Sequence, residues 1–96
     1  MDRLAEMEAF VRVVDHGGFT DAARKMGVSK SAVSKHVSAL EARLGARLLN
    51  RTTRRVSATE IGLAYYERAA RVLIEAAEAD AMAASMQGAP RGELRI

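Results

Sequence analysis

The chain has 96 residues, a formal net charge of +3 and no cysteine, and its sequence pI is near 9.8. These values indicate one small domain, and they exclude disulfides, thiolate metal sites and thiol redox chemistry from the segment. No apolar run approaches the roughly 18 residues of a membrane span and the N-terminus does not open as a signal peptide, so we expect a cytoplasmic protein without a membrane partner.

The first predicted element is a helix over residues 3–15, which ends at two consecutive glycines. Its apolar residues recur at helical spacing and are expected to face a core: Leu4, Met7, Phe10, Val11 and Val14. A second, short helix is predicted over about residues 21–27, with Thr20 placed as its N-cap.

Residues 19–45 have the pattern of two helices joined by a tight turn at Gly27, which tolerates a positive φ. Ala23 is small enough to let the two helices cross, and Ser29 is placed to cap the second of them, over about residues 30–44. One stripe of that helix is apolar and is expected to be buried: Val33, Val37, Leu40 and Leu44. The other side carries polar residues that point outward together: Ser31, Ser34, Lys35 and Ser38. The arrangement is typical of a helix-turn-helix that reads DNA in the major groove.

Two short strands are expected next, at residues 47–50 and 54–57, as a β-hairpin wing around a polar connection. The turn carries no Asn-Gly or Asp-Gly signal, so the wing is a weaker prediction than the helices. Ser57 with Glu60 fits a capping box, and Thr59 is a competing cap one step on.

A long helix is predicted over about residues 60–87, because this segment is rich in alanine and contains no proline. It shows two apolar rows, of which one can pack on the domain and the other can meet a second subunit. The first row is Ile61, Tyr65, Val72, Ala76 and Met86. The second row, which we expect to form a dimer interface, is Tyr66, Ala70, Leu73, Ala77 and Ala84. Residues 88–96 are expected to be a hinge and the first strand of a domain absent from the segment.

The positive charge is concentrated in the middle of the chain. Residues 20–57 contain nine basic side chains and two acidic ones, whereas the two flanks together carry a net charge of −4. A basic segment of this kind favours a polyanionic partner. The two histidines, His16 and His36, have neither cysteine nor paired carboxylates beside them in the predicted helices, so we expect neither a metal site nor an enzyme.

Over essentially its whole length the sequence resembles the N-terminal DNA-binding domain of LysR-type transcriptional regulators. The resemblance rests on Phe10–Val14, Gly18-Phe19-Thr20, Ala22-Ala23, Val28-Ser29, Ser31-Ala32-Val33-Ser34, Leu40-Glu41, Leu44-Gly45, Leu48-Leu49-Asn50-Arg51, Arg54, Val56, Thr59 and Gly62. Two positions depart from a common form of the pattern, because Lys30 often corresponds to glutamine and Lys35 to arginine.

The resemblance implies a mainly α-helical winged helix-turn-helix with a three-helix core and a short β-hairpin wing, followed by a linker helix that dimerises. Residues 1–58 would then form the DNA-binding domain, residues 59–87 the linker helix, and residues 88–96 the start of an effector-binding domain. The homodimer would bind dyad-symmetric promoter DNA as an activator or repressor. A small-molecule coinducer is expected for the full-length protein, and no cofactor is expected in this segment.

The residues expected to contact DNA fall into three groups. The first lies near the base edges on the third helix: Lys30, Ser31, Ser34, Lys35 and Ser38. The second is the wing, where Arg54 would enter the minor groove while Arg51, Thr53 and Arg55 contact the backbone. The third is Thr20 and Ser29, which could cap helices and aim free amides at phosphates.

Several alternatives remain open from the residues alone. The basic segment could be merely a solvated face, and the far half of the long helix could be a frayed, exposed helix without a partner. The serines could form only a solvated face, and Arg51 could pair with a carboxylate of its own domain. The whole chain could be a nonspecific architectural DNA-binding protein, whose affinity would depend almost entirely on salt. It could also be a protein-interaction module whose functional surface is the long helix.

Overall fold

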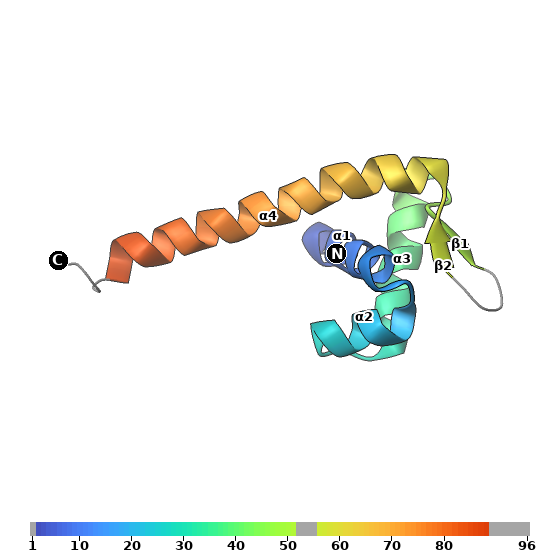
Figure 1. Ribbon diagram of the computed structural model, residues 1–96, viewed down its shortest axis with the longest axis horizontal. Coiled ribbons are helices and arrows are strands. Elements are labelled where there is room, and N and C mark those ends of the chain that lie inside the picture. The colour runs from blue at the N-terminus through green and yellow to red at the C-terminus, as the bar shows by residue number, and fades with distance from the viewer. Residues whose placement is uncertain (1, 52–55, 89–96) are drawn as a thin grey trace.

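The computed structural model describes residues 2–51 and 56–88 of the chain (Figure 1). It is mainly helical, with one two-stranded antiparallel sheet. The elements in chain order are α1 (Arg3–His16), α2 (Phe19–Met26), α3 (Lys30–Leu44), β1 (Leu49–Arg51), β2 (Val56–Ala58) and α4 (Glu60–Gly88). The fold class predicted from the sequence is confirmed. Thr53, Arg54, Arg55 and the predicted hinge from residue 89 onward lie outside the described residues.

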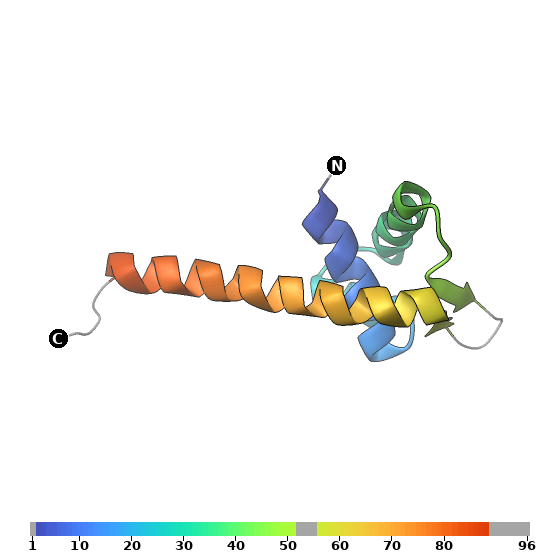
Figure 2. The same cartoon turned by 90° about the horizontal axis from the view of Figure 1, so that it is seen from above.

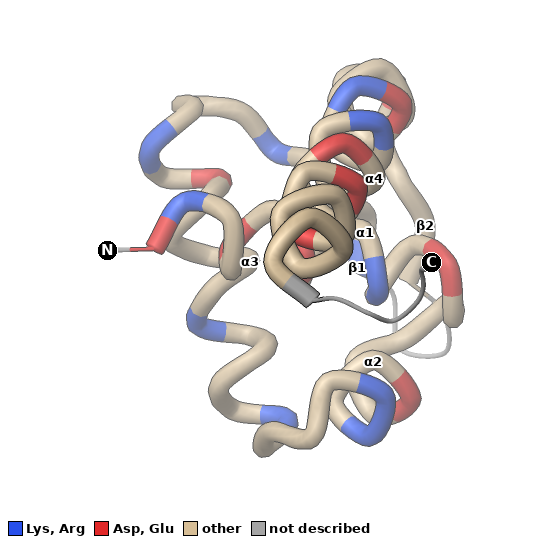
Figure 3. The backbone as a smooth tube through the Cα atoms, turned by 90° about the vertical axis from the view of Figure 1, so that its left-hand side faces the viewer, with Lys and Arg blue, Asp and Glu red and all other residues tan. Residues whose placement is uncertain are grey.

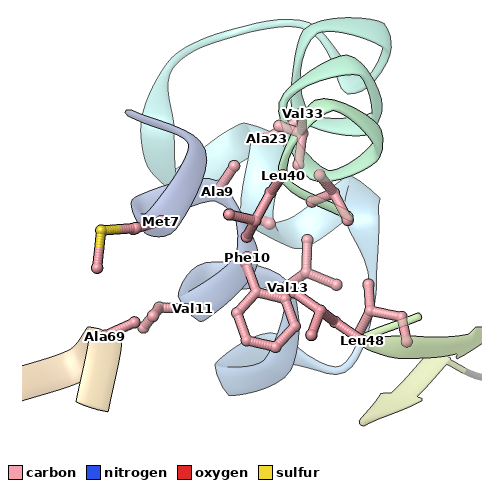
Figure 4. Close-up of a cluster of buried hydrophobic side chains, with 13 residues drawn as sticks. Met7, Ala9, Phe10, Val11, Val13, Ala23, Val33, Leu40, Leu48 and Ala69 are labelled. Carbon is pink, nitrogen blue, oxygen red and sulfur yellow. The ribbon is translucent and has the colours of Figure 1, made fainter. Parts of the chain in front are cut away.

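Helix α1 lies at the centre of the body, because it packs against α2, α3 and α4. Its Phe10 is fully buried and sits among side chains from every other helix and from β1 (Figure 4). The prediction that Leu4 and Leu44 lie in the core is wrong, because Leu4 is 45% exposed and Leu44 is 40% exposed. Leu4 lies in the first turn of α1 and Leu44 is the last residue of α3, so both fall at helix ends beyond the packed centre.

The helix caps agree with the sequence at one expected position and differ at another. Ser29 caps α3, since its Oγ accepts a hydrogen bond from the Ala32 amide at 3.0 Å. Thr20 is not a cap, because α2 begins two residues earlier than predicted, at Phe19, and Gly18 occupies the N-cap position. Phe19 packs against the core, and this contact draws it into the first turn of α2. At the turn between the two helices Gly27 adopts φ 72°, as its position requires.

The hairpin is shifted relative to the prediction. Its register pairs Leu49 with Ala58, Asn50 with Ser57 and Arg51 with Val56. Residues 47 and 48 stay outside β1 because the amides of Leu48 and Leu49 donate to the carboxylate of Glu41, at 2.8 and 3.1 Å. Leu48 is thereby held in the core, where it is fully buried.

Helix α4 begins at Glu60 and is capped by Thr59, whose Oγ1 accepts from the Gly62 amide at 2.9 Å. The competing capping box is wrong, because Ser57 lies in β2. The first half of α4 crosses α1, and the second half projects beyond the body (Figures 1 and 2). The molecule is therefore elongated, with extents of 55 × 23 × 22 Å. Within residues 2–51 and 56–88 no helix has both the length and the apolar character that crossing a bilayer requires.

The two apolar rows of α4 do not divide as expected into one that packs on the domain and one that is left for a second subunit. The fully buried residue is Ala69, which belongs to neither row, so α4 meets the body along the seam between them. Tyr65 from one row and Tyr66, Ala70 and Leu73 from the other pack against the core. Three members of the row expected on the domain are largely exposed: Ile61, Val72 and Met86.

Candidate nucleic-acid interface

The outward face of α3 stands free at the end of the helix that lies farthest from α4 (Figure 1). Val33, Val37 and Leu40 are fully buried and fix the rotation of the helix. The other side is consequently turned to solvent: Lys30, Ser31, Lys35 and Ser38 are exposed and Ser34 is half-buried. None of these five side chains forms a hydrogen bond or ion pair with another residue that the structure describes. The face is a set of free donors and acceptors on a rigid helix.

The beginning of α3 adds backbone donors to this face. The first amides of a helix have no partner within the helix. Ser29 satisfies the amide of Ala32, and the Val33 amide bonds to the Ser29 carbonyl at 3.2 Å. The amides of Lys30 and Ser31 precede these and are directed out of the end of the helix. Together with the helix dipole they suit an anionic group.

Positive charge surrounds the same end of α3. Arg24 and Lys25 lie exposed in the last turn of α2, and Lys30 and Lys35 lie exposed on the first half of α3. Figure 3 shows α2 on the side of the molecule away from α4, with blue segments along it. The one acidic side chain on α2, Asp21, pairs with Arg24 at 3.2 Å on the open surface. An exposed pair of this kind contributes little to stability. The local excess of positive charge suits a polyanion.

Arg51, at the end of β1, forms the carboxylate pair that the sequence left as an alternative. Its Nη2 lies 3.5 Å from Glu41 Oε1. Its guanidinium also stacks over the ring of Phe19, 5.1 Å from the centroid, which the sequence did not indicate. Arg51 thus joins the base of the hairpin to α3 and to the start of α2.

Arg43 was counted with the basic segment, but its guanidinium binds a buried carboxylate of α1, although Arg43 itself remains exposed. Its Nη2 and Nε donate to Glu6 Oε1 at 2.9 and 3.3 Å, and Glu6 is only 2% exposed. The hydrogen bond to Glu6 raises the pKa of Arg43 above its ordinary value. The sequence offered one sign of this ion pair, because the acidic residue Glu6 lies one turn before Phe10 on the buried side of α1. Sequence spacing could not identify a partner 37 residues away.

No cluster of three or more metal-ligating side chains occurs among residues 2–51 and 56–88. The most prominent hollows are open grooves on the surface. Two of them flank α4 where it crosses α1, with volumes of about 430 and 360 Å³.

Comparison with known proteins places the chain among bacterial regulators. The model of the bacterial regulatory helix-turn-helix protein, lysR family, matches residues 4–63. An HTH-type transcriptional regulator of Xanthomonas campestris is 49% identical over 91% of this chain, and an HTH-type transcriptional repressor of Pseudomonas aeruginosa is 46% identical over all of it. The aligned part is 25% and 30% of those two proteins, so the chain spans about a quarter to a third of their length.

A solved structure described as a complex of the BenM DNA-binding domain with a catB site 1 DNA is similar to the chain in fold. The TM-score is 0.84 at 30% sequence identity, over 95% of this chain and 100% of that one. The similarity therefore includes the three-helix body, the hairpin and most of the long helix.

Proposed function

Because the chain belongs to the LysR family of bacterial helix-turn-helix regulators, we propose that it binds a specific promoter sequence with α3 in the major groove. The observation that carries this proposal is the free polar face at the start of α3, next to the basic side chains of α2. A helix that enters the groove end-first brings its first turns closest to the bases. Residues 1–58 are assigned to DNA binding and residues 59–87 to the linker helix.

The side chains of α3 suit different kinds of contact. Lys30 and Lys35 are point donors that can reach guanine O6 or N7, and each good contact of this kind discriminates by about 1–3 kcal/mol. Ser31, Ser34 and Ser38 can donate and accept, so they tolerate more than one base. Ser29 and Thr20 are assigned to phosphate contacts near the helix starts. For Ser29 this role is added to capping, whereas for Thr20 it rests on an exposed hydroxyl alone.

The wing is assigned on its sequence and on the hairpin that precedes it. The antiparallel pairing of β1 with β2 supports a wing beside α3. We assign Arg54 to the minor groove and Thr53 and Arg55 to the DNA backbone, on the sequence argument alone. Besides its pair with Glu41, we assign Arg51 a contact to the DNA backbone, since its side chain is 37% exposed.

The second proposal is a homodimer formed through α4. The helix has 29 residues, and residues 78–87 are exposed throughout. A projecting helical segment of this length is marginal in water without tertiary contacts. Ala70, Ala77 and Ala84 recur every seven residues with Ile74 between them, a spacing that suits close packing of two helices. Ile74 is 58% exposed and lines the 360 Å³ groove beside α1 together with members of the predicted row.

The charges of α4 favour an antiparallel pair. Both basic residues, Arg68 and Arg71, lie in the first half of the helix, where Glu60 and Glu67 balance their charge, whereas its second half is acidic and carries Glu75, Glu78 and Asp80. In a parallel pair the acidic half would meet its own copy. In an antiparallel pair the acidic half of one helix lies beside the neutral half of the other, where Arg68 and Arg71 can meet opposite charges. Tyr66 and Leu73, also in the predicted row, then border the domain and the partner at once.

Selection of bound duplexes from a random DNA library tests the function directly. A dyad motif with half-sites about one helical turn apart is the expected result, since it requires the recognition helix and the dimer together. Binding without sequence preference would instead indicate an architectural protein, and no binding to duplex DNA would indicate a protein-interaction module.

A further inference from the structure

The ion pair between Glu6 and Arg43 has no role in the proposed contacts to DNA, yet it is the most deeply placed charge in the part of the chain that the structure describes. Glu6 is 2% exposed, in a helix whose other buried residues are apolar. Arg43 lies in the last turn of α3, and its side chain is 36% exposed. Two nitrogens of its planar guanidinium donate to one carboxylate oxygen, Glu6 Oε1.

A buried ion pair is weak evidence for stability, because desolvation of the charges offsets much of their attraction. An apolar pair of similar volume would hold α1 and α3 together equally well. What an apolar pair lacks is direction: the planar guanidinium donates to the carboxylate only within a narrow range of angles. The pair therefore restricts the rotation of α3 about its axis and its sliding along α1.

The same position also involves α4. Tyr65 of α4 packs edge-on against Phe10 of α1, with ring centroids 5.8 Å apart and an interplanar angle of 61°. Glu6 lies one turn before Phe10 on α1. Side chains of α1 and α4 thus meet one turn along α1 from the carboxylate that Arg43 binds.

We infer that Arg43 is a positioning residue, which contacts no DNA itself but holds the end of α3 at a fixed angle to α1. This inference rests on the proposed reading of DNA by α3. Arg43 lies 13 residues from Lys30, a distance of about 20 Å along the helix. It acts at the opposite end of α3 from the base contacts, where a small rotation would displace all of them together.

The experiment compares specific with nonspecific binding in the 96-residue chain. The wild-type chain first selects its site from a random library; the affinity of Arg43→Met for that site and for random duplex is then measured over a range of KCl concentrations. Circular dichroism sets a temperature at which every variant is folded. We expect the specific affinity to fall about tenfold, while the nonspecific affinity and the slope of log K against log salt stay at their wild-type values. Arg3→Met is the control, because Arg3 is exposed at the start of α1 and its replacement removes the same positive charge.

Two further variants keep the test decisive. Glu6→Gln preserves shape and an acceptor while removing the charge, so it carries the test if Arg43→Met fails to fold. The double reversal Glu6→Arg/Arg43→Glu is expected to recover specificity that Arg43→Glu alone loses, and a folded double variant without recovery contradicts the inference.

Three results would overturn the inference. Folded Arg43→Met and Glu6→Gln chains with the wild-type ratio of specific to nonspecific affinity would leave the pair with a purely structural role. A salt slope reduced by about 0.9, with equal loss on all sequences, would make Arg43 a phosphate contact. A wild-type chain that selects no sequence would instead overturn the proposed function, and this inference with it.

Discussion

At the scale of single residues, one carboxylate organises the junction between α3, the hairpin and α2. Glu41 Oε2 accepts from the amides of Leu48 and Leu49, and its Oε1 pairs with Arg51. Arg51 in turn stacks on Phe19. The chain can therefore leave α3 and enter β1 without unsatisfied amides, and the start of the wing is fixed relative to the helix that reads DNA.

Lys35→Ala tests whether α3 reads bases. If Lys35 reaches a guanine, its removal should change the ranking of operator variants, with a loss of about 1–3 kcal/mol of discrimination at one base position. Competition binding across single-base operator variants provides the measurement. Lys25→Ala on α2 is the control, since a phosphate contact there should weaken all sequences alike and reduce the salt slope by about 0.9. A uniform loss for Lys35→Ala would reduce Lys35 to a phosphate contact.

Tyr66→Phe tests the bond between α4 and the end of α1. The Tyr66 hydroxyl donates to Asp15, and removing it should lower the free energy of unfolding by about 1 kcal/mol near neutral pH. This hydrogen bond raises the pKa of Tyr66, so the fold favours the protonated phenol. The contribution is therefore fully present below about pH 10 and is lost as pH rises through the raised pKa.

Urea unfolding of both proteins from neutral to alkaline pH measures this effect. The difference in stability between wild type and Tyr66→Phe should shrink above about pH 10. Asp15→Ala should show the same cost near neutral pH, and the double variant should cost no more than either single change. A difference that stays constant across the alkaline range would exclude the hydrogen bond as its source.

What the sequence could reveal at this scale depended on distance along the chain. The outward face of α3 and the Ser29 cap follow from helical periodicity and local chemistry, and both were predictable. The pairing of Arg43 with Glu6 was not, because the partners lie 37 residues apart and surface arginines have the same local pattern. The sequence indicated that Arg51 could pair with a carboxylate of its own domain, but it could not identify that carboxylate as Glu41.

At the scale of elements, the start of α4 is fastened to the segment that precedes β1. Thr59 donates its hydroxyl to the Arg47 carbonyl at 2.8 Å and its amide to the Leu48 carbonyl at 2.9 Å. Gly62 lies directly over the same backbone, where a Cβ atom would be 2.0 Å from the Leu48 oxygen. This approach orients α4 as it leaves the hairpin.

Gly62→Ala should therefore destabilise the protein, although alanine is the better helix former by about 1 kcal/mol. The Leu48 carbonyl cannot withdraw without losing its bond to Thr59, so we expect a net loss of about 1–3 kcal/mol, as for other overpacked sites. Chemical denaturation measures the change. Gly18→Ala is the control, because nothing lies within 4 Å of its added Cβ, and it should change stability by less than about 0.5 kcal/mol. A more stable Gly62→Ala protein would contradict the close approach.

The elements themselves were largely predictable, because α1, α3 and α4 have strong periodicity and clear caps. The errors occur where tertiary contacts compete with local preference. Phe19 draws the start of α2 forward to reach the core, and Glu41 takes amides that a longer β1 would have used. The orientation of α4 was mispredicted because Ala69, a residue without a distinctive signal, is the one that faces the body.

At the scale of the whole molecule, α1 lies between two surfaces with different proposed roles, one for DNA and one for a second subunit. The start of α3 and all of α2 lie on one side of α1, and α4 lies on the other (Figures 1 and 3). A partner that covers α4 would leave the proposed reading face of each subunit open. Two such faces related by a dyad would meet two half-sites on one side of the duplex.

The antiparallel dimer can be tested with charge-reversed variants of α4, measured separately and as a mixture. Arg68→Glu/Arg71→Glu should weaken the homodimer at least about tenfold, because like charges then meet along the pair. Glu75→Arg/Glu78→Arg should weaken it for the same reason with the opposite sign. Mixed together, the two variants should form a heterodimer, because opposite charges again lie side by side. Native mass spectrometry of the mixture measures this directly.

A control separates the position of the charges from their number. Arg24→Glu/Lys25→Glu makes the same change in net charge on α2, away from α4, and should leave the dimer intact. If Arg68→Glu/Arg71→Glu dimerises as tightly as the wild type, Arg68 and Arg71 do not face the acidic half of the partner helix. If neither charge-reversed variant dimerises and their mixture does not either, the two arginines and the two glutamates do not pair across the interface. Only the mixed dimer, formed when both parent dimers are weakened, supports the pairing of Arg68 and Arg71 with the acidic half.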